Sequence, residues 1–184
     1  MKHIETKIKD LIILKPSVFV DSRGYFLESY NQVKFEEIFG KVSFVQDNDS
    51  RSSKGVLRGL HFQKPPFDQA KLVRCIKGEV LDVAVDLRKG SETYGQHLSF
   101  ELSSENKKQL YIPRGFAHGF LVLSEYAVLA YKVDNNYAPD YDSGIRWNDP
   151  TLKIQWGVDE SEIIVSSKDS KLSFFSEFKS PFSI

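Results

Sequence analysis

The chain has 184 residues, enough to bury one hydrophobic core, and no linker divides it, so we expect a single domain over residues 1–184. Hydrophobic residues make up 41% and charged residues 27%, with 25 basic side chains balanced by 25 acidic ones. This neutral balance gives no global attraction to nucleic acid or to an acidic membrane, and we expect neither as a partner.

The N-terminal region carries one short apolar run, residues 11–14. This run is too short for a signal-peptide core or a membrane span, so we expect a cytoplasmic protein. The single cysteine, Cys75, excludes a disulfide framework, and its apolar neighbours predict a small buried side chain.

Residues 32–39 carry the clearest helical pattern. Phe35, Ile38 and Phe39 fall on one stripe, Asn31 stands in the N-cap position, and Gly40 is a stop signal. The pattern predicts one short helix here.

Most of the remaining chain is predicted to form strands and turns. Residues 79–87 alternate, with Asp82 and Asp86 on one face that must meet either solvent or a polar cavity. Lys77 and Gly78 predict a hairpin that joins this strand to residues 71–76.

A second hairpin is predicted around Ser124 and Glu125, between strands at residues 120–123 and 126–133. In the latter strand Tyr131 shares a face with apolar residues, so a barrel interior on that side would receive its phenol. The intervals between turn signals favour an antiparallel sandwich or barrel, and no alternation of strands with helices suggests a dinucleotide-binding fold. The aromatic residues of the tail, 172–178, predict that it docks on the domain or on a second subunit.

Two of the four histidines, His61 and His118, are flanked by glycines and arginines. Histidine is the side chain best suited to act as a base near neutral pH, although a structural histidine bonded to backbone remains an alternative for each. A metal site would need further ligands, and Gln63 stands where a second histidine would follow His61, so we expect no metal.

Several cations accompany these histidines, namely Arg23, Arg58, Lys71 and Arg114. These side chains are suited to binding a diphosphate, and the alternative is that they are ordinary charged residues exposed to solvent. The chain has neither the phosphate-binding loop of nucleotide hydrolases nor the glycine fingerprint of dinucleotide-binding domains.

Six runs of residues, in order along the chain, resemble the dTDP-4-dehydrorhamnose 3,5-epimerase family. They cover residues 46–48, 55–63, 69–74, 82–88, 112–120 and 145–150, and the register extends from Asp21 to Asp169. The resemblance implies a cupin-type jelly roll that acts as a homodimer without metal or organic cofactor. It also implies inversion of carbons 3 and 5 of a dTDP-4-keto-6-deoxyglucose-type sugar, giving dTDP-4-dehydro-L-rhamnose for the rhamnose route.

The resemblance assigns roles to individual residues. It implies that His61 is the proton acceptor, that Asp169 pairs with it, and that Tyr131 is the proton donor. Lys71, with Arg58 or His118, is expected to stabilise the enolate oxygen that forms when the proton leaves. Tyr137 falls where an aromatic ring stacks on the base, and Asp142 replaces the family's usual glutamate. The other binding positions implied are Arg23, Glu28, Gln46, Asp47, Asn48 and Lys168.

Other activities remain open at this point. A related enzyme could invert carbon 3 alone or isomerise a keto sugar with the same histidine base. A non-catalytic sugar-binding cupin and a metal-dependent cupin oxygenase are the alternatives from other classes.

Overall fold

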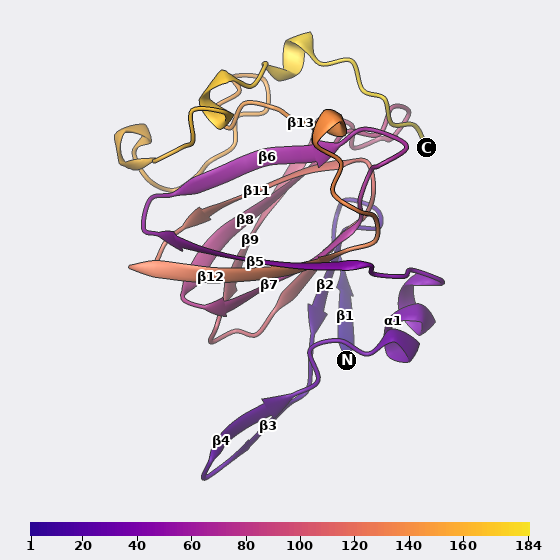
Figure 1. Ribbon diagram of the computed structural model, residues 1–184, viewed down its shortest axis with the longest axis vertical. Coiled ribbons are helices and arrows are strands. Elements are labelled where there is room, and N and C mark those ends of the chain that lie inside the picture. The colour runs from indigo at the N-terminus through magenta and orange to yellow at the C-terminus, as the bar shows by residue number, and fades with distance from the viewer.

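The computed structural model describes residues 1–184, and antiparallel strands dominate it (Figure 1). One sheet has six strands in the order β1-β2-β10-β7-β12-β5, a second has five in the order β13-β6-β11-β8-β9, and a separate hairpin pairs β3 with β4. The bounds of the six-stranded sheet are β1 Lys2–Glu5, β2 Ile12–Lys15, β10 Gln109–Ile112, β7 Lys71–Lys77, β12 Tyr126–Val133 and β5 Gln46–Ser53. Those of the remaining strands are β13 Asp142–Gly144, β6 Leu57–Gln63, β11 Phe116–Val122, β8 Glu79–Asp86, β9 His97–Ser103, β3 Val18–Asp21 and β4 Gly24–Leu27.

The two larger sheets face each other, and the chain passes between them repeatedly (Figure 1). From β5 to β8 each successive strand lies in the opposite sheet, and the same holds from β9 to β12. This connectivity is that of a jelly roll. The predicted all-β jelly-roll class is therefore confirmed.

The predicted helix is confirmed as α1 (Gln32–Phe39). The side chain of Asn31 accepts a hydrogen bond from the backbone N–H of Lys34, and the N–H of Gly40 donates to Glu36 at the other end. Phe35 is buried against Tyr111 and Leu72, so α1 covers part of the outer face of the six-stranded sheet. None of the helices is long and apolar enough to cross a membrane.

Both predicted hairpins are wrong. The turn at Lys77 and Gly78 leads from β7 in one sheet to β8 in the other, and the turn at Ser124 and Glu125 likewise leads from β11 to β12. These turns are corners between sheets, and they lie together because Ser124 Oγ accepts a hydrogen bond from the backbone N–H of Glu79. A turn signal marks a reversal of the chain but does not state whether the next strand pairs with the previous one.

The alternation of β8 sorts its side chains between two cores. Its even face, with Asp82, points into the space between the two sheets, where Val80 and Ala84 join the main core. Its odd face packs against the C-terminal segment through Val83 and Val85. The even face thus meets the barrel interior, which decides the alternative left open by the sequence.

The C-terminal segment, residues 145–184, lies over the five-stranded sheet (Figure 1). Trp147, Trp156 and Phe182 are buried there, and Phe175 and Phe178 pack beside them. The segment also contains short 3₁₀ turns at Glu160–Glu162, Asp169–Lys171 and Phe175–Glu177, while a fourth, Pro139–Tyr141, precedes β13. The predicted docking of the tail on the domain is confirmed.

Candidate active site

Two adjoining cavities open inside the barrel, and three side chains line both of them. These shared residues are His61, Lys71 and Tyr131. The larger cavity, about 480 Å³, is also lined by Arg58, His118 and Asp169. The smaller, about 260 Å³, is also lined by Gln46, Tyr137 and Asp142.

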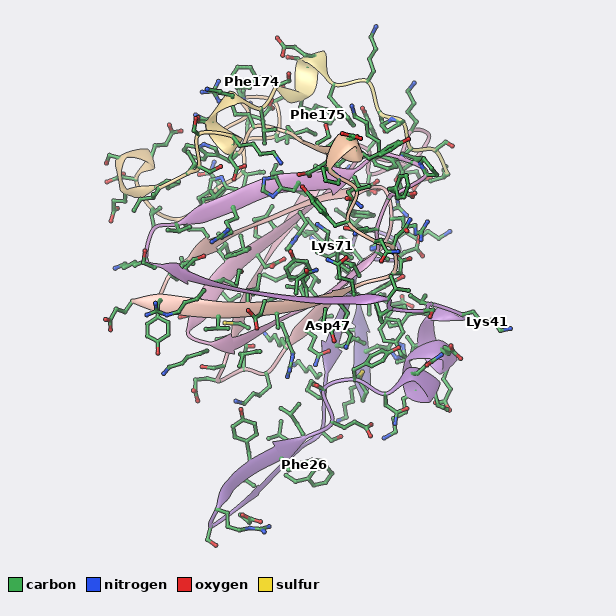
Figure 2. All side chains as sticks on the ribbon, viewed as in Figure 1. Phe26, Lys41, Asp47, Lys71, Phe174 and Phe175 are labelled. Atoms are coloured by element: carbon green, nitrogen blue, oxygen red, sulfur yellow. The ribbon has the colours of Figure 1, made fainter.

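The side chains reach the cavities because strands from both sheets turn one face inward. His61 comes from β6 and His118 from β11, opposite each other in the five-stranded sheet, and Lys71 and Tyr131 come from β7 and β12 of the six-stranded sheet. Figure 2 shows Lys71 between the two sheets. Gly59 allows β6 to approach β11, since a Cβ atom there would lie 2.5 Å from the Cα of Gly119. The site is thus built from residues far apart in the sequence.

His61 and Asp169 form a hydrogen-bonded pair. The distance from His61 Nε2 to Asp169 Oδ1 is 2.8 Å, and the aspartate side chain is 5% exposed while the imidazole is 32% exposed. Burial alone raises the pKa of Asp169, but hydrogen bonding to His61 and Gly59 outweighs it and holds the pKa below its usual range. A carboxylate accepts only, so it keeps a proton on Nε2 and leaves Nδ1 free to take another.

Tyr131 stands on the wall formed by β12. Burial raises the pKa of its phenol, and the nearby charge of Arg58 opposes that shift. The phenol therefore stays protonated at neutral pH, as a proton donor must. Arg58 is held in turn by a hydrogen bond from its Nε to Ser52 Oγ, 3.0 Å long.

Lys71 is the cavity residue whose titration is most altered. Barrel walls surround its amine although the side chain remains partly accessible from the cavity, and this burial lowers the pKa of Lys71 to about 8. The negative charges of Asp82 and Asp142 oppose the shift. A lysine in this state is still largely protonated at neutral pH and can donate a hydrogen bond to an oxyanion.

Asp142 connects two predicted binding residues at the rim of the cavities. Its Oδ2 accepts a hydrogen bond from the Tyr137 hydroxyl at 3.2 Å and forms an ion pair with Lys168. The hydrogen bond to Asp142 raises the pKa of Lys168. Since Lys168 precedes Asp169, this contact links the aromatic ring at the rim to the segment that holds the imidazole.

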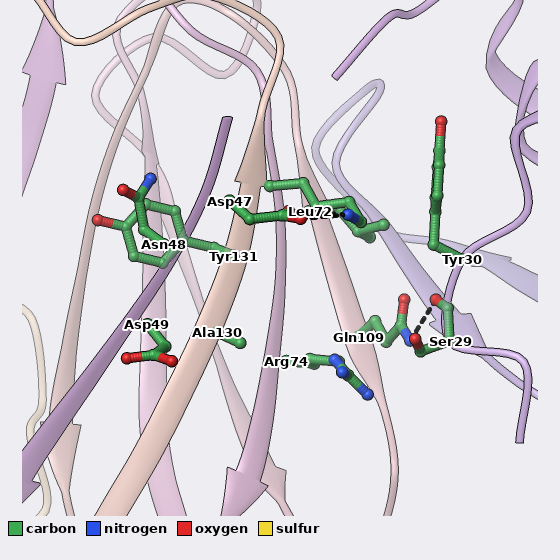
Figure 3. Close-up of a pocket in the computed structure, with 11 residues that line it drawn as sticks. Ser29, Tyr30, Asp47, Asn48, Asp49, Leu72, Arg74, Gln109, Ala130 and Tyr131 are labelled. Atoms are coloured by element: carbon green, nitrogen blue, oxygen red, sulfur yellow. Dashed lines mark hydrogen bonds and ion pairs between the residues drawn. The ribbon is translucent and has the colours of Figure 1, made fainter. Parts of the chain in front are cut away.

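The predicted residues of β5 divide between its two faces. Gln46 and Asn48 point inward and line the smaller cavity, where Gln46 Nε2 donates to Asn48 Oδ1 at 2.8 Å. Figure 3 shows Asn48 beside Tyr131, whereas Asp47 is directed to the other side of the sheet, where it pairs with Lys132 at 2.7 Å. Asp47 therefore lies outside the two cavities of its own barrel.

Arg23 and Glu28 also lie outside these cavities. Arg23 sits at the turn of the β3–β4 hairpin, which projects from the barrel, and its side chain is 88% exposed and pairs only with Asp21 (Figure 1). Glu28 follows β4 and pairs with Lys34 at 2.7 Å. Neither residue appears among those that line the cavities.

One buried acid was not predicted as part of the site. Asp82 is fully buried, and its Oδ2 lies 2.9 Å from His118 Nε2. In the sequence, the alternation of β8 places Asp82 on the same face as Val80 and Ala84, and this pattern was the signal that could have identified Asp82 as a buried acid. No group of three or more histidine, cysteine, aspartate or glutamate side chains is arranged to hold a metal ion.

Comparison with known proteins agrees with the fold and the motifs. A family described as dTDP-4-dehydrorhamnose 3,5-epimerase matches residues 5–177. The dTDP-4-dehydrorhamnose 3,5-epimerase of Escherichia coli is 56% identical over 173 residues, which cover 94% of this chain and 93% of that protein.

The chain belongs to the dTDP-4-dehydrorhamnose 3,5-epimerase family.

Solved structures of this family superpose closely on the chain. The epimerase of Elizabethkingia anophelis is 54% identical, with a TM-score of 0.92 and coverage of 96% of this chain and 97% of that one. The Legionella pneumophila enzyme, solved in complex with dTDP-4-keto-L-rhamnose, is 46% identical, with a TM-score of 0.93 and coverage of 97% and 94%. The resemblance predicted from six sequence runs is confirmed, as is the assignment to a family of isomerases.

Proposed function

We propose that this chain inverts carbons 3 and 5 of a dTDP-4-keto-6-deoxyglucose-type sugar to give dTDP-4-dehydro-L-rhamnose. The relatives carry this activity in their names, and one was solved with dTDP-4-keto-L-rhamnose. The observation that carries the chemical proposal is that His61, Lys71 and Tyr131 line the same cavities.

The first step is removal of a proton by His61. The ketone at carbon 4 acidifies the neighbouring hydrogens, because the electron pair of the broken C–H bond moves into an enolate. His61 takes the proton on Nδ1, and Asp169, 2.8 Å from Nε2, stabilises the resulting imidazolium.

The enolate oxygen requires donors that are already in place. Lys71 supplies a buried ammonium from the six-stranded sheet, and Arg58 or His118 supplies further N–H groups from the five-stranded sheet. Losing one such donor costs about 100- to 1000-fold in rate in comparable oxyanion sites. Lys71→Met should therefore reduce kcat by about that factor.

Tyr131 completes the inversion by protonating the carbon from the opposite face of the ring. Its phenol proton passes to carbon, and solvent then restores the phenol and removes the extra proton from His61. A base and an acid on opposite faces distinguish inversion from simple exchange of hydrogen.

Tyr131→Phe separates these two steps. In deuterated water the variant should still incorporate deuterium beside the ketone, since His61 is intact, while formation of the inverted product slows by about 100-fold or more. Mass spectrometry and proton NMR of the sugar measure both. Tyr126→Phe on the outer face of the same strand is the matched control and should behave like the wild type. Equal loss of exchange and inversion would contradict the donor role.

We assign binding of the nucleotide part of the substrate to residues at the rim of the two cavities. Tyr137 would stack on the base beside Gln46 and Asn48, and Arg58 and Lys168 would contact the diphosphate. Binding energy from this remote part would hold the sugar in reactive alignment.

Counting exchanged carbons tests the choice of reaction. Two deuterium atoms incorporated by the wild type, at carbons 3 and 5, support the proposal, and one at carbon 3 indicates the simpler epimerase. Binding of the nucleotide sugar by the wild type without any turnover would favour a non-catalytic sugar-binding role, and unaltered turnover after His61→Ala would remove His61 from the mechanism.

We also propose that the enzyme acts as a homodimer. The β3–β4 hairpin projects from the barrel, and Figure 2 shows Phe26 on it. Val20 is 77% exposed and Phe26 is 68% exposed. A lone two-stranded hairpin with exposed apolar side chains needs a partner surface. A second copy would cover it and bring Arg23 toward the cavities of the partner.

Mixing two inactive variants tests this arrangement. If Arg23 serves the partner's site, Arg23→Ala and His61→Ala subunits should together recover about a quarter of wild-type activity, since random exchange makes half the dimers mixed, each with one complete site. Each variant alone is the control. Lack of recovery, with exchange of subunits shown by native mass spectrometry, would place Arg23 outside the partner's site.

A further inference from the structure

The loop that carries Tyr137, residues 134–138, leads from β12 in the six-stranded sheet toward β13 in the five-stranded sheet (Figure 1). It belongs to no strand or helix, so its backbone N–H and C=O groups are not paired in a strand ladder. Tyr137 is 54% exposed, so burial of its own ring does little to hold the loop. Side chains from other segments must therefore fix its position.

Gln63, the last residue of β6, binds this loop on both sides of Tyr137. Its Nε2 donates to the carbonyl oxygen of Asn136 at 3.1 Å, and its Oε1 accepts from the N–H of Ala138 at 2.7 Å. Its Nε2 also donates to the carbonyl oxygen of Phe67 at 2.6 Å. Gln63 is 5% exposed, so its whole amide is used inside the protein.

A second glutamine holds the residue between these two bonds. Gln46 Oε1 accepts from the backbone N–H of Tyr137 at 3.2 Å, and Gln46 Nε2 donates to Asn48 Oδ1. Residues 136–138 are thus each bound by a glutamine side chain, from β6 or from β5. The hydroxyl at the far end of the Tyr137 ring donates to Asp142, so the residue is held at its backbone and at its tip.

We propose that Gln63 is a positioning residue that holds Tyr137 ready for the base of the nucleotide and thereby sets the affinity for the nucleotide. The proposal rests on the proposed function, in which the Tyr137 ring stacks on that base. Both residues line the smaller cavity. A ring that is already ordered loses less conformational freedom on binding, so the nucleotide binds more tightly.

The position of Gln63 two residues after His61 raises a second possible role, support of the imidazole. The contacts argue against it, because none of the side-chain hydrogen bonds of Gln63 involves His61 or Asp169. The imidazole has its own partner in Asp169. Loss of the Gln63 amide should therefore act on nucleotide binding and KM, and should leave the proton transfer itself in place.

The first test measures binding of dTDP to the whole enzyme by calorimetry. Gln63→Met keeps the length of the side chain and removes the bonds beside Tyr137, so Kd should rise about tenfold. Gln63→Glu, which lacks both donors, should also bind dTDP more weakly. Gln155→Met is the control, since Gln155 is exposed and donates only to Lys153, and its Kd should equal that of the wild type.

Two comparisons show whether Gln63 acts through Tyr137. In a Tyr137→Ala background, Gln63→Met should weaken dTDP binding little further, because the ring that it positions is gone. In turnover, Gln63→Met should raise KM about as much as Kd and keep kcat within about twofold. Fully additive losses of affinity would overturn the proposal. A fall in kcat with unchanged Kd would also overturn it and assign Gln63 to the support of His61.

The second test observes the loop without a nucleotide. Hydrogen–deuterium exchange of the peptide that spans residues 134–141 reports how often its amides open. Exchange at Tyr137 and Ala138 should be faster in Gln63→Met and unchanged in Gln155→Met. Equal exchange in wild type and Gln63→Met would overturn the proposal. Absence of dTDP binding by the wild type would instead overturn the proposed nucleotide site, whatever the exchange rates.

Discussion

At the scale of single residues, the bond between His61 and Asp169 links chemistry to stability. Hydrogen bonding holds the pKa of Asp169 below its usual range, so the folded state binds a proton less readily than the unfolded state. The stabilisation is therefore present above the unfolded pKa of a carboxyl group, about 3.9. It is lost as the pH falls through the lower folded pKa.

Asp169→Asn should show both effects. The rate constant kcat should fall by about 100- to 10,000-fold, because the amide no longer favours the required ring tautomer or the imidazolium. Stability measured by urea unfolding should become less dependent on pH in the acid range. The exposed Asp140→Asn is the control and should change neither quantity. An unchanged kcat would remove Asp169 from the mechanism.

At the scale of elements, the corner between β7 and β8 depends on a glycine. Gly78 has φ 77°, and a Cβ atom there would lie 2.1 Å from the carbonyl oxygen of Tyr126. The neighbouring corner between β11 and β12 thus leaves no space for a side chain. Both corners lead from one sheet to the other, so their contact fixes how the sheets meet.

Gly78→Ala should destabilise the protein by more than backbone strain alone. Gly157 shares a φ of 77° but has open space around it, so Gly157→Ala is the matched control and should cost about 1 kcal/mol. The close approach at Gly78 should add about 1–3 kcal/mol. Thermal unfolding of both variants measures the difference, and equal losses would show that the corners can separate.

The same corners show what the sequence predicts and what it does not. Alternation correctly grouped Tyr131 with the apolar residues of β12, and the capping pattern predicted both ends of α1 correctly. The pairing of strands failed because a period of two identifies faces but not neighbours. Likewise, the motifs located His61 and Asp169, but the projecting position of Arg23 depends on the hairpin's path, which no local pattern encodes.

At the scale of the whole molecule, the C-terminal segment and the barrel share one core. Both tryptophans, Trp147 and Trp156, lie in that segment and pack against strands of the five-stranded sheet. We propose that residues 1–184 form a single cooperative domain.

Two optical probes test this proposal. Tryptophan fluorescence reports the C-terminal segment and far-ultraviolet circular dichroism reports the sheets, so their unfolding transitions should coincide. Trp147→Ala should lower the stability seen by both probes by about 3–5 kcal/mol. Two separated transitions would show that the segment detaches as an independent unit.

The pairing of His61 with Asp169 also bears on how the protein is made. The two residues are 108 positions apart, and the aspartate follows every strand of both sheets along the chain. A growing chain that had emerged only as far as β13 would possess the strands of both sheets and the imidazole, yet lack the carboxylate that orients it. The hydrogen bond between the two side chains can therefore form only after the strands of the whole barrel have been made.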